Sequence, residues 1–249
     1  MRCFDDDPSL TWTFFFAHPD DELGVAGWMN HLVKSGCRVH ACWAHSTPVR
    51  MHESLAAMNL VGLDDDDCRF GDLPDGGFLS ELLSMDSWIH DVLEDTMADR
   101  YVTPAFEQGH LDHDALHYAV HRWTGHRHWE FPMYWHYARV WQRIGEFADP
   151  TGEEVWPLDD ETMDLKREMI QVYESQTVAR NLAGYEILER LKGARLGQME
   201  RMRHVVKPNY SEPVHPEPAR TKIIRSQRWK QWDSGIRQWV ESAGDPNWT

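Results

Sequence analysis

Short apolar runs alternate with amphipathic stretches over the first half of the chain. The runs predict four β-strands, over residues 10–17, 39–44, 68–70 and 101–105. The intervening stretches space their apolar residues helically and predict four helices, over residues 22–34, 51–60, 78–98 and 113–123. Parallel strands joined by right-handed helical crossovers satisfy this order. We therefore expect an α/β fold, with a Rossmann-like open and mostly parallel sheet and helices on both of its faces.

The second half of the chain has a less regular pattern. Aromatic residues favour an extended stretch over 129–137, and prolines and a glycine favour a loop over 146–160. Helices are expected over residues 161–176, 185–203 and 226–240. The last helix carries an apolar stripe that predicts a packing anchor, made by Trp229, Trp232, Ile236, Trp239 and Val240. We expect residues 1–200 to form the α/β domain and residues 201–249 to form a helical and extended C-terminal extension packed on it.

Charge argues against one class of function. The 249 residues include 25 Lys and Arg against 41 Asp and Glu, a net charge of -16. A surface this acidic repels phosphate backbones, so we do not expect a general nucleic-acid binder. Residues 201–249 differ, with 9 Lys and Arg against 5 Asp and Glu, a net charge of +4. We interpret them as a basic segment folded back on an acidic body. The alternative is a contact for an anionic substrate or a second subunit.

The sequence also indicates where the protein works. No apolar run approaches the roughly 18–20 residues that span a bilayer, so no membrane span is expected. The start of the chain is acidic at residues 5–7, unlike a secretory signal. The four cysteines, at positions 3, 37, 42 and 68, form no C-x-x-C pair. We expect reduced thiols in a cytoplasmic protein and no thiolate zinc site.

The first cluster of reactive side chains follows the first predicted strand. It contains His18, Asp20 and Asp21, although a single Asp would be enough to cap the next helix. Ligands of open α/β sheets bind beyond the carboxyl ends of the strands, which is where this cluster lies. Histidine and carboxylate are zinc ligands, and a second carboxylate can act as a base. The cluster therefore predicts one wall of a metal-dependent site.

The second cluster follows the fourth predicted strand and contains His110, Asp112 and His113. As a structural feature alone it would be a polar loop and a helix cap. The four-residue spacing of His113, His117 and His121 also allows one helix face to bind a metal by itself. We rank that alternative lower, because the last two lie farther from the strand ends. Together, the clusters at neighbouring strand ends predict a site for one divalent ion.

These motifs resemble those of the PIG-L/LmbE-like zinc deacetylases, a family that removes N-acetyl groups mostly from amino sugars. The likeness is carried by AHPDDE at residues 17–22 and GHLDHDA at residues 109–115. It extends to Arg50 with Glu53 and Ala57, to LPDG at 73–76, to Lys166 and to YESQ at 173–176, and so covers about residues 10–180. The resemblance implies one zinc ion per chain and a small N-acetylated sugar as substrate. A homo-oligomer is compatible with it.

The resemblance also assigns roles residue by residue. It implies His18, Asp21 and His113 as zinc ligands, Asp20 as general base, His110 as general acid oriented by Asp112, and Arg50 with Asp75 as substrate-binding residues. Two histidines and one carboxylate leave a zinc position open for water, which is consistent with these roles. A structural pairing with Glu53 is the alternative for Arg50.

One position departs from the family pattern. Some members have a tyrosine that steadies the oxyanion immediately before the Gly-His pair, and this chain has Gln108 there. The resemblance then leaves the role to Tyr134, to another residue or to zinc alone.

Three rival interpretations stay open. Two histidines and a carboxylate also form the triad of non-haem iron oxygenases, but those enzymes resemble double-stranded β-helix folds. A second rival is an amidase of the same family that acts on a non-sugar or thiol-conjugate amide. A third is a non-catalytic carbohydrate-binding protein, because aromatic faces stack on sugars and the chain has 13 tryptophans. Because every ligand, base and acid position is filled, we expect a zinc-dependent N-deacetylase.

Overall fold

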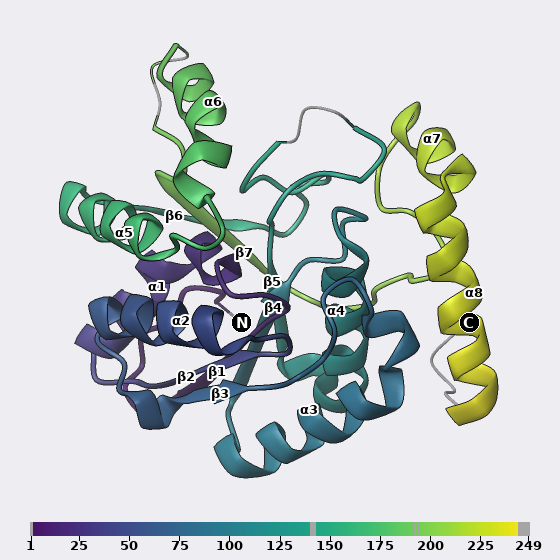
Figure 1. Cartoon of the computed structure of the whole chain (residues 1–249), viewed down its shortest axis with the longest axis horizontal. Coiled ribbons are helices and arrows are strands. Elements are labelled where there is room, and N and C mark those ends of the chain that lie inside the picture. Colours follow the sequence, from purple (N-terminus) through teal and green to yellow (C-terminus); the bar gives the residue numbers. More distant parts are fainter. Residues whose placement is uncertain (1, 140–142, 192, 194, 244–249) are drawn as a thin grey trace.

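A seven-stranded sheet forms the centre of the computed structural model (Figure 1). The structure describes residues 2–139, 143–191, 193 and 195–243. The strand order is β3-β2-β1-β4-β5-β7-β6. The five strands from β3 to β5 in this order are parallel, and β7 and β6 complete the sheet as antiparallel strands. The predicted Rossmann-like α/β fold is confirmed, and its mixed edge is the element that the sequence pattern did not show.

The first half of the chain alternates strands and helices as expected. The parallel strands are β1 (Thr11–Phe16), β2 (Arg38–Trp43), β3 (Cys68–Phe70), β4 (Arg100–Pro104) and β5 (His128–Phe131). The helices between them are α1 (Ala26–Lys34), α2 (Pro48–Val61), α3 (Leu82–Thr96) and α4 (Leu111–Thr124). Short 3-10 turns, Asp21–Gly24 and Phe78–Ser80, precede α1 and α3. The predicted elements are confirmed, with boundaries displaced by a few residues.

The central strand β1 is apolar because both of its faces are covered. Phe14 and Phe16 are fully buried in one core, which α1, α2 and α5 (Asp160–Val172) complete. Phe15 points to the other face and is buried in a second core, completed by α3, α4 and α8 (Gln227–Ala243). Successive side chains of a strand face opposite sides of the sheet, so an unbroken apolar run requires helices on both. Figure 1 shows these two layers of helices on either side of the sheet.

Two expectations for the second half are wrong. The segment 146–160, expected as a loop, contains β6 (Glu154–Pro157). The segment 185–203, expected as a helix, contains the end of α6 (Val178–Leu191) and then β7 (Met199–His204). Residues 192 and 194 of this segment lie outside the described part of the chain. Both strands are only partly buried and carry charged residues, so neither forms the apolar run from which a strand is recognised.

Strand β7 is tied to the first half of the chain by one carboxylate. Glu200 is buried and accepts hydrogen bonds from the backbone N–H of Gly27 at 2.8 Å and of Trp28 at 2.7 Å. It thereby caps the start of α1, whose first N–H groups have no partner within the helix. Lys166 Nζ of α5 lies 2.9 Å from the same carboxylate. The predicted division at residue 200 falls within this strand, and the division into two domains stays a prediction.

The C-terminal helices α7 (Ala219–Arg225) and α8 lie on the outer side of α4 (Figure 1). Trp232 and Ile236 of α8 are fully buried, and Trp229 and Trp239 nearly so. The predicted packing stripe is confirmed as part of the second core. All four cysteines are buried and free of disulfide bonds. None of the described helices is both long enough and apolar enough to cross a membrane.

Candidate active site

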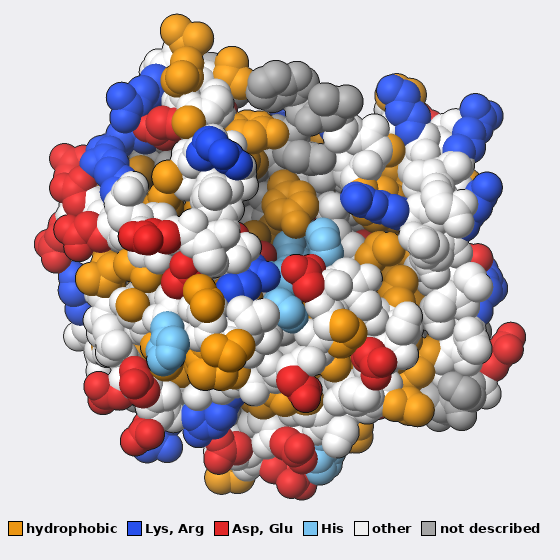
Figure 2. All heavy atoms as spheres, viewed as in Figure 1, with side chains coloured by type: hydrophobic (Ala, Val, Ile, Leu, Met, Phe, Trp, Pro, Cys, Tyr) orange, Lys and Arg blue, Asp and Glu red, His pale blue; other side chains and the backbone are white. Residues whose placement is uncertain are grey.

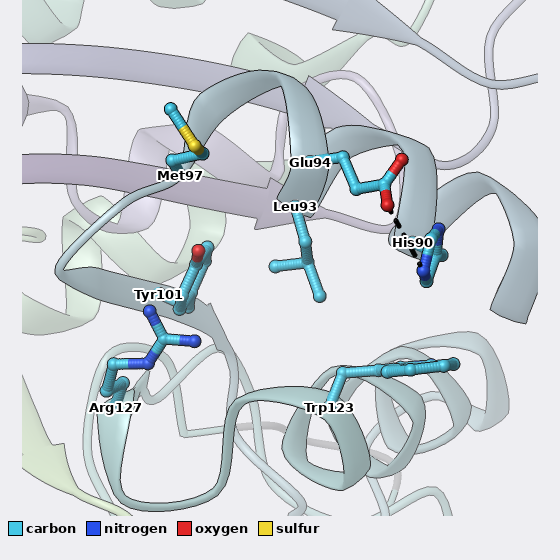
Figure 3. Close-up of a pocket in the computed structure, with 7 residues that line it drawn as sticks. All are labelled: His90, Leu93, Glu94, Met97, Tyr101, Trp123 and Arg127. Carbon is cyan, nitrogen blue, oxygen red and sulfur yellow. Dashed lines mark ion pairs between the residues drawn. The ribbon is translucent and has the colours of Figure 1, made fainter.

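Two surface cavities could each be considered as a binding site in place of the two polar clusters. One, of about 280 Å³, is lined by Leu93, Met97, Tyr101 and Trp123, between α3, α4 and the beginning of β4 (Figure 3). It lies toward the amino end of the sheet, opposite the edge where such folds bind ligands. The other, of about 430 Å³, lies at the ends of β2 and β3 beside Thr47. Neither is lined by a residue of the two clusters.

The two clusters meet at the carboxyl edge of the sheet. Strands β1 and β4 are parallel neighbours, so the segments that follow them leave the sheet side by side. The first segment carries His18, and the second leads into α4, whose first turn carries His113. The rings of these two histidines are 5.6 Å apart. Figure 2 shows histidine side chains at the bottom of a central hollow in the surface.

The predicted metal ligands converge. Asp21 Oδ1 lies 3.2 Å from His113 Nε2, and Asp21 Oδ2 lies 3.8 Å from His18 Nδ1. All three side chains are buried. Two ligand atoms that each lie about 2.0–2.1 Å from a tetrahedral zinc ion are roughly 3.3 Å apart. The distance from Asp21 to His113 is therefore close to what a bound ion needs, whereas the distance to His18 is longer. Among the described residues, the groups whose ligand atoms all lie within 4.8 Å of one another contain His18 and His110, one of them with His113, and do not contain Asp21.

The unused nitrogen of His113 supports the same conclusion. His113 Nε2 is buried and has no hydrogen-bond partner among the described residues. Its contact with Asp21 lacks hydrogen-bond geometry. A buried ring nitrogen without a partner is unfavourable unless something else binds it. A divalent ion at this position would satisfy it.

The second nitrogen of His18 faces carboxylates. His18 Nε2 lies 3.0 Å from Asp112 Oδ2 and 3.3 Å from Asp75 Oδ1. Metal-binding histidines usually donate their other ring N–H to a carboxylate, which fixes the ring orientation. Burial opposes the charged form of this ring, but the hydrogen bonds to Asp112 and Asp75 raise the pKa of His18 to about 10. Binding of a metal at Nδ1 therefore requires His18 to release a proton.

Asp112 contacts both His18 and His110. Its carboxylate accepts hydrogen bonds from the backbone N–H of Gly76 at 2.7 Å and of Phe78 at 3.2 Å, in addition to its contact with His18. The Asp112 N–H donates to His110 Nδ1 at 3.2 Å, and Asp112 Oδ2 lies 3.9 Å from the same nitrogen. The carboxylate of Asp112 therefore lies against both histidine rings, and that it orients His110 stays a prediction.

His110 lies close to the metal ligands. Ligand atoms of His110, His18 and His113 lie within 4.8 Å of one another. Burial lowers the pKa of His110 to about 4, and the neighbouring His113 and His18 act in the same direction. Asp112 opposes this shift but does not reverse it. His110 is therefore neutral near pH 7 in the metal-free protein.

Asp20 differs from its neighbour Asp21. Its backbone is in the left-handed region, with φ of 99°, which is strained for a residue with a side chain. Burial and the charge of Asp21 raise the pKa of Asp20 to about 7. Burial would also raise the pKa of Asp21, but His113 and His18 hold it below its usual range. The two adjacent carboxylates thus differ in charge at neutral pH, as distinct roles require.

Glu22 is a site residue whose role the sequence did not reveal. It is fully buried, accepts hydrogen bonds from Trp43 Nε1 at 3.0 Å and from the Asp20 N–H at 3.1 Å, and also accepts one from the Tyr173 hydroxyl. Burial raises the pKa of Glu22 to about 8. Its hydrogen bond to the Asp20 N–H stabilises the strained turn at Asp20. The only signals in the sequence were that Glu22 and Tyr173 belong to family-like motifs 151 residues apart.

Arg50 and Asp75 lie beside Asp20. Arg50 is buried, donates from Nη2 to the carbonyl oxygen of Pro19 at 2.8 Å, and places Nη1 3.6 Å from Asp75 Oδ2. Its Nη2 is 4.0 Å from Asp20 Oδ1. The alternative pairing with Glu53 does not form, because Glu53 binds Ser175 instead. Arg50 therefore supports the first cluster, and the side chain of Asp75, 57% exposed, faces solvent.

The remaining histidines of α4 do not extend the site. His117 Nε2 pairs with Glu130 Oε2 at 2.7 Å, and His117 Nδ1 hydrogen-bonds with the hydroxyl of Tyr210. His121 contacts His128. Within the described parts of the chain, the possible metal-binding groups do not include these residues. The helix-only metal site considered from the sequence is therefore not formed.

The backbone of Tyr134 packs closely against Gly109, the residue after Gln108. A side chain at Gly109 would come within 2.3 Å of the Tyr134 carbonyl oxygen, so this close approach requires glycine. The ring of Tyr134 is 5.4 Å from that of His113. Gln108 instead uses its carboxamide oxygen to accept a hydrogen bond from the Val214 N–H at 3.0 Å. Of these two residues, Tyr134 is the one whose side chain lies against His113, a predicted metal ligand.

Part of the chain matches a known family. Residues 13–124 match the PIG-L family model, described as GlcNAc-PI de-N-acetylase, and both motifs lie within them. The resemblance inferred from the sequence is confirmed over this range. No curated protein gives a significant match to the sequence.

Solved structures share the fold. The A40926 pseudoaglycone deacetylase Dbv21 has a TM-score of 0.59 and 17% identity, over 80% of this chain and 98% of its own. The N,N'-diacetylchitobiose deacetylase of Pyrococcus horikoshii has a TM-score of 0.53 and 13% identity, over 85% and 89%. GalB, a 4-carboxy-2-hydroxymuconate hydratase of Pseudomonas putida, has a TM-score of 0.51 and 14% identity, over 82% and 100%. The fold thus hosts more than one reaction, and function must be argued from the site.

Proposed function

We propose that the protein is a metal-dependent hydrolase that removes an N-acetyl group from an N-acetylated amino sugar or sugar conjugate. The observation that carries this proposal is the convergence of His18, Asp21 and His113 beside Asp20 at the carboxyl edge of the sheet. The match of residues 13–124 to a de-N-acetylase family supports the choice of reaction. Two of the similar structures are described as deacetylases, which agrees with it.

The metal is proposed to be zinc. Two imidazoles and one carboxylate, with a position left open, are a typical catalytic zinc set. His18, Asp21 and His113 would hold the ion, and Asp112 would keep the ring of His18 in place through Nε2. Such an ion, when bound, polarises the amide carbonyl and makes a water molecule easier to deprotonate.

Asp20 is the proposed general base. A base works best when its pKa lies near the working pH, and burial places that of Asp20 at about 7. Arg50 lies near its carboxylate, and the Asp20 N–H is bound to Glu22, so the turn is held from two sides. Asp20 would take the proton of the attacking water.

His110 is the proposed general acid for the leaving amine. Because its pKa is lowered to about 4, it is neutral before the reaction. Asp20 takes one proton from the attacking water, and His110 must take up a proton from solvent before it can pass one to the nitrogen as the C–N bond breaks. The later release of the proton from Asp20 to solvent restores the balance. Tyr134 is the proposed hydrogen-bond donor to the acyl oxygen, in the place that Gln108 does not fill. Asp75 and Arg50 would contact the hydroxyls of the sugar.

Metal content and acetate release test the proposal together. We expect about one zinc ion per chain in wild type, a large loss in His113→Ala, and no loss in His126→Ala, which changes an exposed histidine outside the site. The zinc-loaded protein should release acetate from a panel of N-acetylated sugars, sugar phosphates and nucleotide sugars, and Asp20→Asn should not. Equal metal in wild type and His113→Ala, or no acetate from any member of the panel, would contradict the proposal.

A further inference from the structure

Three cations gather beside the active-site loop. Arg139 follows β5, Lys222 lies on α7 and Arg228 lies on α8, and all three are exposed. Burial lowers the pKa of His136 to about 4, and the charges of Arg139 and Lys222 act in the same direction, so both lie near this residue. We call Arg139, Lys222 and Arg228 the basic rim. Figure 2 shows Lys and Arg side chains over α7 and on the neighbouring side of the central hollow.

Aromatic rings hold two of these cations. The guanidinium carbon of Arg139 lies 5.2 Å from the centre of the Trp135 ring, and that of Arg228 lies 5.7 Å from the centre of the Tyr137 ring. A cation over an aromatic face gains electrostatic energy from the ring. The rim therefore presents guanidinium groups that are partly oriented before any ligand arrives.

Residues close to the basic rim are hydrogen-bonded to the loop that carries His110. The Tyr137 N–H donates to the carbonyl oxygen of Gln108 at 2.5 Å, and His215 Nε2 donates to that of Glu107 at 2.7 Å. These carbonyls are two and three residues before His110. A ligand held by the rim would thus lie beside the loop that supplies the proposed acid.

The positive charges of Lys222 and Arg228 are not paired with carboxylates of the described residues, although the protein as a whole is acidic. The net charge of the chain is -16. The nearby carboxylates are otherwise engaged or enclosed: Glu212 pairs with Arg220 at 2.8 Å, and Asp114 is buried and binds two backbone N–H groups. Local positive charge beside an acidic body attracts anions to this spot.

We propose that the basic rim binds a phosphate group carried by the N-acetylated substrate. Guanidinium groups bind phosphate oxygens through paired hydrogen bonds, and a lysine adds a point charge. The substrate class would then be a phosphorylated or nucleotide-linked N-acetyl sugar, with its acetamide at the metal ligands and its phosphate at the rim. The identity of the rest of the substrate rests on the proposed function, whereas the anion site itself does not.

Binding of inorganic pyrophosphate to the metal-free protein tests the site directly. Calorimetry at low salt should show binding to wild type that weakens as salt is added. The double change Lys222→Glu with Arg228→Glu should weaken it at least tenfold. Lys230→Glu is the matched control, because it makes the same charge change on an exposed position of α8 about 200° around the helix from Arg228. This control should bind pyrophosphate as wild type does.

Kinetics then link the site to catalysis. In wild type, kcat/KM for N-acetylglucosamine 1-phosphate should exceed that for methyl N-acetylglucosaminide, and the double variant should reduce this ratio at least tenfold. No binding of pyrophosphate, or equal binding to the double variant, would overturn the inference. If pyrophosphate binding depends on the rim but no probe releases acetate, the proposed function fails and the anion site stands.

Discussion

His18 must lose a proton before it can bind a metal ion, so metal affinity should depend steeply on pH. Burial disfavours the charged ring, but hydrogen bonds to Asp112 and Asp75 raise its pKa to about 10. At pH 7 the group is about three pH units below that value, so displacing its proton costs about 4 kcal/mol. Between pH 6 and 9, zinc affinity should therefore rise about tenfold per pH unit, with about one proton released by this residue.

The carboxylate of Asp112 is the group to perturb. Asp112→Asn removes its negative charge from His18 Nε2 but keeps an oxygen that can accept a hydrogen bond. The pKa of His18 should fall, and the slope of affinity against pH should flatten. In the metal-free wild type, the stability that the charged His18 contributes is fully present below its unfolded pKa of about 6.5. It is lost as the pH rises through about 10.

Two measurements check this prediction. Zinc titration calorimetry at pH 7, in buffers with different ionisation enthalpies, gives the number of protons released. Competition against a chelator of known zinc affinity gives the slope between pH 6 and 9. Release of much less than one proton by wild type, or the same slope in Asp112→Asn, would refute the proposed charge state of His18.

Three further outcomes are expected. Asp20→Asn should keep the metal and lower kcat by roughly 10²–10⁴-fold, whereas Asp21→Asn should lose metal affinity; the reverse pattern would exchange the two roles. In wild type, kcat/KM should fall as the pH drops through the pKa of Asp20, which burial and Asp21 raise to about 7, because only the charged base accepts a proton; the pH profile of a working substrate measures it. Glu200→Gln should lower the free energy of unfolding by about 3–5 kcal/mol, because it leaves the ammonium of Lys166 buried without its charged partner. The control Lys34→Met, at an exposed ion pair, should change it by at most about 1 kcal/mol. Urea denaturation of wild type and the two variants measures both.

The central sheet could be predicted because its signals are local. The parallel strands β1, β2 and β4 are buried over almost their whole length and therefore contain short apolar runs, and β3 is a three-residue strand beside them. The strands β6 and β7 carry no such run, because they are partly exposed and their pairing joins segments more than 40 residues apart. A strand such as β7, which contains Glu200 and Arg203, is stabilised by partners that no window of sequence contains.

The candidate site likewise has a part that the sequence predicts and a part that it does not. The sequence indicates that His18, Asp20 and Asp21 directly follow one buried strand and that His110 and His113 follow another, so that these side chains gather at one edge of the sheet, whereas their proposed roles come from the resemblance to a family. The supporting contacts could not be predicted, because they connect distant segments: Tyr173 reaches Glu22 across 151 residues, and Glu200 reaches Gly27 across 173. The protonation states of the site residues could not be predicted from the sequence either. Burial, His113 and His18 lower the pKa of His110 to about 4, and these causes depend on packing that the sequence does not show.

We expect part of the substrate choice to be made outside the range that supplies the proposed ligands, base and acid, in addition to the contacts proposed for Arg50 and Asp75. The proposed ligands, base and acid all lie in residues 13–124, the range that matches the family. The basic rim and the contacts of His215 and Val214 with the active-site loop all come from residues after it. Because these later residues surround the hollow without holding the metal, changes among them should alter which N-acetylated compound binds while leaving metal content intact. The C-terminal part is therefore the place to look for specificity, whereas changes that abolish the chemistry itself should concentrate in the two motifs.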